Sequence, residues 1–388
     1  MFASVDVVST RDTRYKRLVD EQILMHAALA GRLENERAYS AVELVEALAV
    51  FMPSALECKR LKSELKSHRK AFACGDIDID VVRLDGRRRF LLSGLPGASG
   101  LEVAVHYGDN LAVLPTLRTG SYELIYIDPP FNTGYDQQRT RLRTTEDSSG
   151  DRVGFAGKRY RTEEIGSSSF ADSFEDFMGF LEPRLREAHR LLTDEGALFF
   201  HIDYREAHYC KVLLDQIFGR DSFMNEIVWA YDYGARSKKR WSAKHDVIFW
   251  YAKNPRQYTF NHQAMDRIPY MAPGLVGAEK AAKGKTPTDV WWHTIVPTAG
   301  KERTGYPTQK PLGILRRIIA VHTNPGDRVL DFFAGSGTTA VAAREMGRSV
   351  TLIDANPEAL TVIEQRLEPY CPTMHGWDSS SQRSQQGG

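Results

Sequence analysis

The chain has 388 residues, of which 42% are hydrophobic and 26% are charged, and its formal net charge is +1. That length allows one large hydrophobic core, or one core with a smaller domain attached. No segment is apolar enough for a membrane span, and the first residues lack the apolar core of a signal peptide. The 4 cysteines include no CxxC pair, so neither a metal site nor a disulfide framework is indicated, and a cytoplasmic setting is expected.

Residues 1–95 are expected to form a separate region of helices followed by a hairpin. Ser40 and Glu43 have the spacing of a capping box, in which each side chain accepts a hydrogen bond from the other residue's backbone N–H. The stretch 77–94 has strand-like residues on both sides of the Asp-Gly pair at 85–86, which is typical of a hairpin turn. Together these elements would form a winged-helix-like module that contacts DNA or a partner.

Residues 96–375 are expected to form the larger domain, in which short apolar strands alternate with helical patterns. This alternation is typical of a parallel sheet covered on both faces. Two strands between 226 and 251 have no helix between them, so we expect an antiparallel pair at the sheet edge. The predicted fold class is therefore α/β, with a doubly wound, mostly parallel sheet of seven strands. The seven segments are 101–109, 122–128, 196–203, 226–231, 245–252, 328–335 and 349–355.

Two stretches within this domain, 135–169 and 232–305, are expected to be loops, except for the strand at 245–252. Loops of this length inside a compact domain usually carry function or lack order. Residues 376–388 are rich in Ser and Gln, and we predict a disordered tail there.

The strand at 122–128 ends in Asp128, which is followed by Pro129, Pro130 and Phe131. Open α/β sheets bind ligands at the carboxyl ends of their strands, so the Asp128 carboxylate is expected to face a ligand. Proline cannot donate to a sheet ladder, so both prolines would end strand pairing and leave carbonyl oxygens free. Two acceptors beside an aromatic ring suit a planar heterocycle whose amino group receives an alkyl group. The alternative is a plain turn in which Asp128 caps a helix.

The stretch 328–347 reads as a strand, a turn of small residues and a helix that begins near Thr338. Gly335 and Gly337 lack a Cβ, so the turn can adopt positive φ and a ligand can approach the backbone and the helix N-terminus. Asp354 ends the next strand, near the offset at which doubly wound folds place a carboxylate on a ribose. These features favour an adenosine-containing cofactor over a tight turn without a ligand. A nicotinamide cofactor is disfavoured because the third glycine is missing.

The segments IDPPFNTG and DFFAGSGTTA together resemble the DNA amino-methyltransferases that use S-adenosyl-L-methionine. The D-P-P-F segment precedes the F-x-G-x-G loop, which is the circularly permuted order of the β-type enzymes. That group includes the modification subunits of type III restriction systems. The resemblance covers about residues 101–370 and implies a Rossmann-like fold for them. In this family D-P-P goes mostly with adenine N6 and S-P-P more often with cytosine N4.

The resemblance therefore implies a site-specific DNA adenine-N6 methyltransferase, with a cytosine-N4 or RNA base methyltransferase as the alternative. The segment from Asp128 to Phe131 would be catalytic, with Phe131 stacking on a base flipped out of the duplex. Asp109 would bind the cofactor's adenine ring, and Asp331 and Asp354 would accept from its ammonium and ribose hydroxyls. Lys310 would lie near the methionine end, where it could neutralise a carboxylate. The expected cofactor-binding residues are Asp109, Thr308, Gln309, Lys310, Asp331, Phe332, Phe333, Ala334, Gly335, Gly337, Thr338 and Asp354.

Basic residues cluster at several points of this nearly neutral chain, which is typical of a protein that meets a polyanion on one face. The clusters beside the predicted active site would contact double-stranded DNA, and the two long loops would read its sequence. Solvated surface is the alternative for each cluster. The residues expected to bind DNA are Arg139, Arg141, Arg143, Lys238, Lys239 and Arg240.

Several further expectations concern partners and nearby side chains. Many relatives of this type act as dimers, so a homodimer is expected, and a restriction or other partner subunit is left open. A non-catalytic nucleic-acid-binding module is the alternative of a different class. His245 and Asp246 are expected to pack or cap a strand rather than act in catalysis, and Trp291 and Trp292 are expected to pack.

Overall fold

The structure is a computed structural model of the chain. It describes most of the larger domain and parts of the N-terminal region. The described residues are 24, 27, 28, 33, 37–49, 55–67, 72–74, 77–84, 87–93, 101–132, 137–146, 152–153, 159–170 and 174–377 without 235, 298, 299 and 301.

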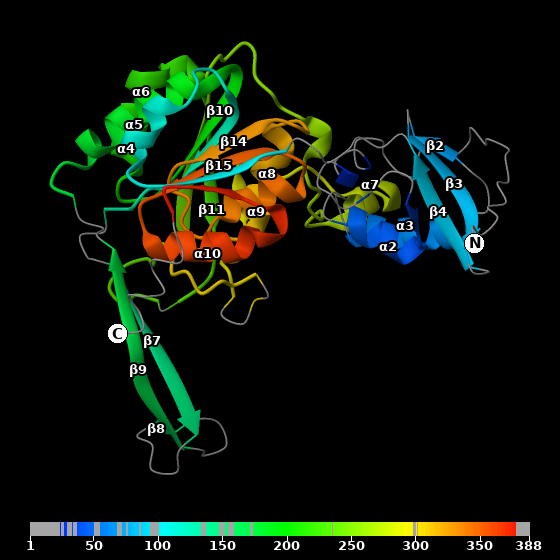
Figure 1. Cartoon of the computed structure of the whole chain (residues 1–388), viewed down its shortest axis with the longest axis horizontal. Coiled ribbons are helices and arrows are strands. Elements are labelled where there is room, and N and C mark those ends of the chain that lie inside the picture. Colours follow the sequence, from blue (N-terminus) through cyan, green and yellow to red (C-terminus); the bar gives the residue numbers. More distant parts are fainter. Residues whose placement is uncertain are drawn as a thin grey trace.

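A nine-stranded sheet forms the centre of the larger domain (Figure 1). All neighbours in it are parallel except at β12, which is antiparallel to both β10 and β11. The mostly parallel α/β sheet and the antiparallel pair toward one edge are thus confirmed. In sheet order, the strands are β13 (Val290–Trp292), β11 (Phe223–Ala230), β12 (His245–Ala252), β10 (Leu192–Asp203), β6 (Tyr122–Ile127), β14 (Arg328–Asp331), β15 (Ser349–Asp354), β5 (Val103–Tyr107) and β16 (Thr373–His375).

The prediction of seven strands was too low, because the short strands β13 and β16 extend the two edges of the sheet. Each has only three residues, too few to show the alternation that marks a strand in the sequence. Trp291 and Trp292 lie in β13, where Trp291 is buried in the core, as expected, and Trp292 is 74% exposed, which the sequence did not predict.

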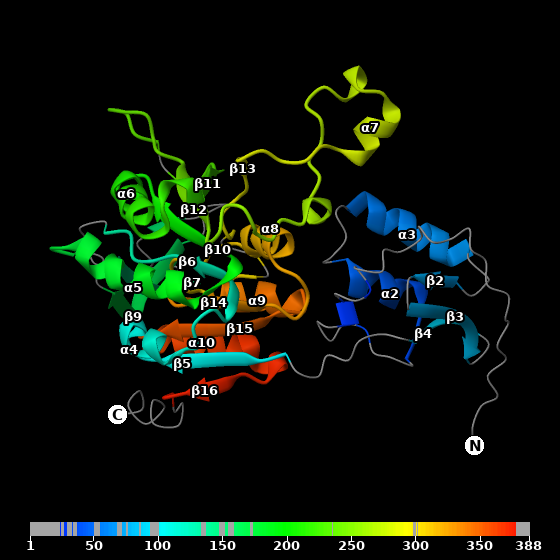
Figure 2. The same ribbon diagram turned by 90° about the horizontal axis from the view of Figure 1, so that it is seen from above.

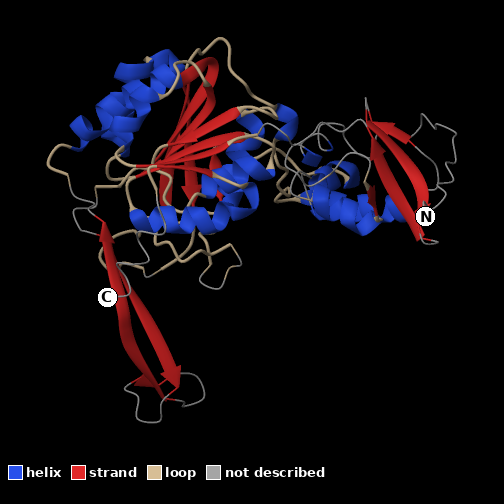
Figure 3. Ribbon diagram, viewed as in Figure 1, coloured by secondary structure: helices blue, strands red, loops and turns tan. Residues whose placement is uncertain are grey.

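Helices cover both faces of the sheet, as Figure 3 shows. Side chains of β6 alternate between two cores: Leu124 and Tyr126 pack on one side, and Ile125 and Ile127 on the other. A strand buried on both faces therefore reads as one apolar run in the sequence. The helices are α4 (Asn110–Val113), α5 (Phe177–Leu191) and α6 (Ala207–Phe218) on one face, and α8 (Leu312–His322), α9 (Thr338–Glu345) and α10 (Pro357–Leu367) on the other.

The N-terminal region forms a smaller unit with its own core, beside the larger domain in Figure 2. Ser40 and Glu43 form the expected capping box, and β3 and β4 pair as the expected antiparallel hairpin. The winged-helix likeness and a DNA or partner contact remain predictions. The elements are β1 (Ala38–Tyr39), α2 (Ala41–Leu48), α3 (Ala55–Ser67), β2 (Phe72–Cys74), β3 (Ile77–Leu84) and β4 (Arg87–Ser93).

The described part of the stretch 135–169 is not a loop, contrary to the prediction. Its described part is an antiparallel ribbon of β7 (Gln137–Glu146), β8 (Arg152–Val153) and β9 (Arg159–Phe170), which projects from the domain in Figure 1. The stretch 232–305 is largely irregular, as predicted, apart from β12, β13, the helix α7 (Ala278–Lys283) and two 3-10 turns.

At the C-terminus, the predicted tail begins too early. Trp377 is still part of the fold, because its ring packs edge-on against Tyr107 at a centroid distance of 5.3 Å. Residues 378–388 lie outside the described part of the chain. Among the described residues, no helix combines the length and the apolar character that crossing a membrane requires.

Candidate active site

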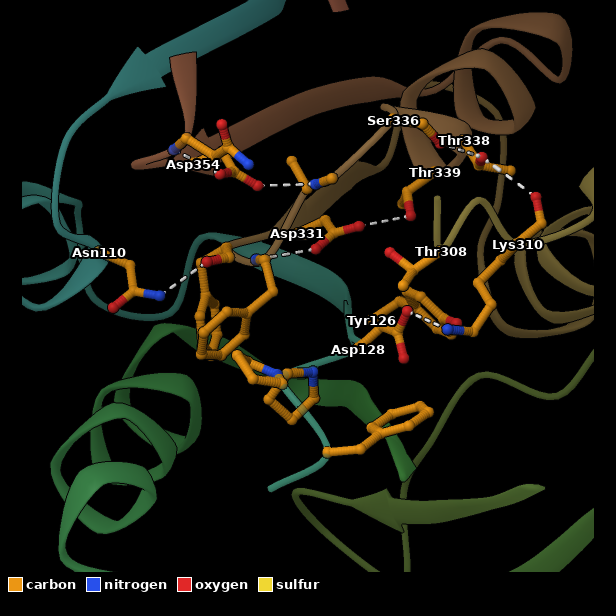
Figure 4. Close-up of a pocket in the computed structure, with 18 of the residues that line it drawn as sticks. Asn110, Tyr126, Asp128, Thr308, Lys310, Asp331, Ser336, Thr338, Thr339 and Asp354 are labelled. Atoms are coloured by element: carbon orange, nitrogen blue, oxygen red, sulfur yellow. Dashed lines mark hydrogen bonds and ion pairs between the residues drawn. The ribbon is translucent and has the colours of Figure 1, made fainter. Parts of the chain in front are cut away.

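The D-P-P-F segment and the glycine loop meet at the end of the sheet where the central parallel strands have their carboxyl ends. The strands that lead into them, β6 and β14, are parallel neighbours, with Leu124 opposite Val329 and Ile125 opposite Leu330. Asp128 and Asp331 therefore emerge side by side at the carboxyl ends of these strands, although about two hundred residues separate them in sequence. Both line one cavity of about 810 Å³ (Figure 4).

Most of the expected catalytic and cofactor-binding residues line this cavity, and two do not. Gln309 is absent from the lining because its amide is used within its own loop, where it accepts from Thr304 and donates to the Glu302 carbonyl at 2.7 Å. Gly337 is the N-cap of α9 and is not among the lining residues. The expected residues that line the cavity are Asp109, Asp128, Pro129, Pro130, Phe131, Thr308, Lys310, Asp331, Phe332, Phe333, Ala334, Gly335, Thr338 and Asp354.

The glycine loop has the backbone geometry that its sequence predicts. Gly335 and Gly337 have φ values of +50° and +71°, and α9 begins at Thr338. A Cβ on Gly337 would lie 3.0 Å from Ile363 Cγ1, so the turn also needs glycine for close packing on α10. Ser336 lies between them, and its carbonyl accepts from Arg366 at 2.9 Å.

Two carboxylates flank this loop, the buried Asp331 and the partly buried Asp354, and backbone N–H groups reach both of them. Asp331 accepts from the Phe333 N–H at 3.0 Å and from the Thr339 hydroxyl at 2.6 Å. Asp354 accepts from the Gly335 N–H at 2.7 Å. Burial raises the pKa of Asp331 to about 7 and that of Asp354 to about 6, since it penalises the charged form more than these bonds favour it. Both carboxylates are therefore ready to take a further donor or a cation.

Asp128 is held on one side only. Its Oδ2 forms an ion pair with the Lys310 ammonium, whereas its Oδ1 is buried and has no hydrogen-bond partner among the described residues. The Lys310 Nζ also lies 4.9 Å from the centroid of the Phe131 ring. The sequence placed Lys310 at the methionine end of a cofactor, which stays a prediction, and the structure pairs its ammonium with Asp128 (Figure 4).

Asn110 and Arg184, which the sequence did not point to, also line the cavity beside Asp109. Asp109 caps α4 and accepts from Arg184 Nη2 at 2.9 Å. The next residue, Asn110, is buried, accepts from Arg184 Nε at 2.6 Å and donates to the Phe332 carbonyl at 2.8 Å. Asn110 therefore ties the end of β5 to the glycine loop. Its position directly after Asp109 was the available signal, whereas nothing in the sequence linked Arg184 to the site.

Four more polar side chains are connected to one another at this part of the site. Tyr126, Tyr231 and Asp246 line the cavity, and His201 lies behind them with its side chain fully buried. Asp246 bonds to His201 Nε2 at 3.2 Å and accepts from the Tyr231 hydroxyl at 3.1 Å. Asp246 was expected to pack or cap a strand, and the structure places this residue in the lining of the cavity that also contains the D-P-P-F segment.

The residues expected to bind DNA lie outside the cavity. Lys238, Lys239 and Arg240 are exposed in the connection from β11 to β12. Arg139, Arg141 and Arg143 belong to β7, and the positions of their side chains are outside the described part of the structure. A shared DNA-binding surface for these six residues stays a prediction.

Residues 122–365 match the N6_N4_Mtase family, described as DNA methylase. The chain is 29% identical over 273 residues to the type II methyltransferase M.HpaI of Haemophilus parainfluenzae, covering 70% of this chain and 76% of that protein. It is 28% identical over 275 residues to the DNA adenine methyltransferase YhdJ of Escherichia coli strain K12, covering 68% of this chain and 81% of that protein. The solved M1.HpyAVI–SAM complex is similar at 19% identity and a TM-score of 0.44, covering 68% of this chain and 98% of that chain.

These matches leave the expected likeness to type III modification subunits as a prediction, since M.HpaI is named a type II enzyme. The family match includes both predicted motifs and spans more than half of the chain. The chain therefore belongs to the N6_N4_Mtase family of DNA methylases.

Proposed function

We propose that this DNA methyltransferase transfers a methyl group from S-adenosyl-L-methionine to the exocyclic N6 of adenine in double-stranded DNA. The observation that carries the proposal is the environment of Asp128. Its Oδ2 is paired with Lys310, and its Oδ1, in a residue that lines the cavity, has no hydrogen-bond partner among the described residues. An ionised carboxylate oxygen is an acceptor only, so it suits an amino N–H.

Adenine is favoured over cytosine by the D-P-P-F segment, because the family resemblance associates D-P-P mostly with adenine N6. The name of YhdJ, an adenine methyltransferase 28% identical to this chain, supports the same choice. Cytosine N4 is the second candidate, since its exocyclic amine offers the same N–H donor to Asp128.

The cavity fits the chemical groups of S-adenosyl-L-methionine, the methyl donor of this family. Asp331 would hold the ammonium, because a cation beside a buried carboxylate offsets the burial that raises its pKa to about 7. Asp354 would accept from the ribose hydroxyls, and Asp109 would face the adenine ring at the other end of the cavity. When bound, the cofactor supplies an electrophilic methyl group on its sulfonium.

The protein's own contribution to transfer would be positioning and electrostatics. Asp128 Oδ1 would accept one N–H of the target amine and fix the orientation of its nitrogen. Pro129 and Pro130 stiffen the chain directly after Asp128, because each proline has a fixed φ. Phe131 would stack on the base. Lys310 holds the other Asp128 oxygen, so the carboxylate cannot rotate without breaking that ion pair.

A base inside a duplex cannot reach this cavity, so we infer that the target base is flipped out. The connection from β11 to β12 lies at the same end of the sheet as Asp128. It leads into the start of β12, where Asp246 is paired with Asp203 at the carboxyl end of β10. Within it, Trp241 is 99% exposed and follows Lys238, Lys239 and Arg240 directly in sequence. An aromatic ring beside cationic side chains suits contact with phosphates and an unstacked base.

The β7–β9 ribbon would add a second contact at the same end of the sheet. Asn132, the residue after Phe131, accepts from the Phe174 N–H at 3.0 Å. Asn132 precedes the ribbon and Phe174 follows it, so the chain enters and leaves the ribbon near the active site. Its β7 strand carries Arg139, Arg141 and Arg143. We infer that these arginines contact the DNA backbone.

Incubation of the purified chain with S-adenosyl-L-methionine and unmethylated genomic DNA tests the proposal. Single-molecule sequencing would locate modified bases, and nucleoside mass analysis would identify them. We expect N6-methyladenine within one recurring sequence. N4-methylcytosine alone would contradict the adenine assignment, and the absence of any methylated base would contradict the proposed activity altogether.

A further inference from the structure

Four polar side chains form a continuous hydrogen-bonded chain behind the catalytic segment. The Tyr126 hydroxyl lies 2.8 Å from His201 Nδ1, and His201 Nε2 lies 3.2 Å from Asp246 Oδ2. The Tyr231 hydroxyl donates to Asp246 Oδ1 at 3.1 Å. Tyr126, His201 and Asp246 come from β6, β10 and β12, so the chain crosses three neighbouring strands of the sheet.

The chemistry of these groups decides which imidazole nitrogen carries the proton. An ionised carboxylate can only accept, so His201 must donate to Asp246 from Nε2. Burial would raise the pKa of Asp246, but hydrogen bonds from His201 and Tyr231 and the nearby Lys310 ammonium lower it below its ordinary value, so this carboxylate is ionised. An imidazole whose only ring proton is on Nε2 accepts at Nδ1, so the Tyr126 hydroxyl, 2.8 Å away, would be the donor there.

The hydroxyl of Tyr126 keeps its proton, because burial and the negative charge of Asp128 raise its pKa well above the ordinary value. Tyr126 is thus a hydrogen-bond donor close to Asp128. His201 would be a second donor there if its proton were on Nδ1 instead of Nε2. His201 Nδ1 lies only 3.8 Å from Asp128 Oδ1. If Nδ1 carried the proton, a small shift of the ring would bring an N–H onto the oxygen that the target amine needs.

We propose that His201 is a positioning residue that keeps Asp128 Oδ1 free for the target amine. Asp246 holds His201 in the Nε2–H form, and His201 then draws the Tyr126 hydroxyl to itself and offers no donor to Asp128. This inference rests on the proposed function, and it applies equally to an adenine or a cytosine amine. The imidazole also packs near the ring of Phe131, at a centroid distance of 5.9 Å. It would therefore help to hold the ring on which the base is proposed to stack.

Asp246→Asn tests the proposal because it reverses the donor pattern without changing the shape of the side chain. Tyr231 would donate to the amide oxygen of the new side chain, so the amide NH₂ would face His201 Nε2 and force the proton onto Nδ1. Tyr231→Phe is the matched control, since it removes one bond to Asp246 but leaves the donor pattern at His201 intact.

We expect single-turnover methyl transfer by D246N to fall by about 100-fold or more, as a wrong histidine tautomer does elsewhere. Affinities for S-adenosyl-L-methionine and duplex DNA should change by less than about threefold, and Y231F should lose only a few-fold in rate. Nitrogen-15 NMR of labelled histidine, with His201 identified by its loss in H201Q, should show the Nε2–H form in the wild type and the Nδ1–H form in D246N.

An Nδ1–H tautomer in the wild type would overturn the inference, and this measurement needs no folded variant of Asp246. A D246N protein with a switched tautomer and the wild-type rate would also overturn it, while leaving the proposed function intact. A wild type that transfers no methyl group to any DNA base would defeat the proposed function, and this inference with it.

Discussion

The two halves of the cavity satisfy their carboxylates in different ways. In the glycine-loop half, Asp331 accepts from groups two and eight residues away, and Asp354 from groups two and nineteen residues away. In the D-P-P-F half, Asp128 pairs with Lys310, which lies 182 residues further along the chain, and its second oxygen has no partner among the described residues.

The difference teaches how binding and reaction are separated within one site. The glycine-loop half is built from local sequence, with backbone N–H groups fixing each carboxylate before any ligand arrives. The D-P-P-F half depends on side chains from distant elements, and it leaves one acceptor unused. We infer that the first half binds the cofactor and that the second acts on the target amine.

The largest expected effect separates the two halves at Asp128. Asp128→Ala should lower methyl transfer by about 10³-fold or more, because an acceptor placed for the reacting amine is lost. Cofactor affinity, measured by calorimetric titration, should stay within about threefold. Asp194→Ala, at the opposite end of β10, is the control and should transfer normally. Weak cofactor binding by D128A would show that the halves are not separate.

A substitution in the glycine loop should do the reverse. Gly337→Ala places a Cβ at a φ of +71°, 3.0 Å from Ile363 Cγ1. We expect a loss of about 1–3 kcal/mol in the free energy of unfolding and roughly tenfold weaker cofactor binding. Gly274→Ala, where the added Cβ meets open space, is the matched control for thermal unfolding and titration. Unchanged cofactor affinity in G337A would contradict the role of this turn.

The rim outside both halves should affect DNA affinity alone. Lys239→Ala should weaken binding to all duplex sequences by a few-fold and reduce the salt slope by about one, because one phosphate contact is lost. Fluorescence anisotropy at several salt concentrations measures both quantities. Lys283→Ala, an exposed lysine paired with Glu279 on α7, should leave them unchanged. An effect confined to one sequence would identify Lys239 as a base-reading residue instead.

The smallest effect concerns pH and the buried carboxylate of the glycine-loop half. Burial raises the pKa of Asp331 to about 7, so the folded protein holds a proton that the unfolded chain releases at lower pH. Its contribution to the free energy of unfolding therefore falls as pH rises, and the full penalty is present above about pH 7. The wild-type melting temperature should drop more between about pH 5 and 7 than that of Asp331→Asn, and the two should run parallel above about pH 8. An equal drop in both proteins would contradict this assignment.

The same division explains what the sequence could predict. The seven longer strands, the positive φ of the glycine turn and the start of α9 follow from local pattern, and the structure confirms them. The ribbon of β7 and β9 escaped prediction because its sequence is mostly polar, without the apolar alternation that marks a strand with one buried face.

Residues that depend on register were beyond the sequence analysis. His201 reaches Asp246 because β10 and β12 pair with Asp203 opposite Asp246, and a shift of one residue would turn that carboxylate to the other face. The ion pair of Asp128 and Lys310 likewise depends on tertiary packing between elements far apart in sequence. Local sequence patterns carry no information about contacts between residues that are distant in the sequence.

The most direct test of the account is the position of the target base in a crystal structure with duplex DNA and S-adenosylhomocysteine. The account predicts the exocyclic nitrogen of a flipped adenine within hydrogen-bond distance of Asp128 Oδ1, at about 2.7–3.2 Å, with Phe131 against the ring. A flipped base whose amine contacts other acceptors, with Asp128 Oδ1 bonded to a protein donor, would contradict it.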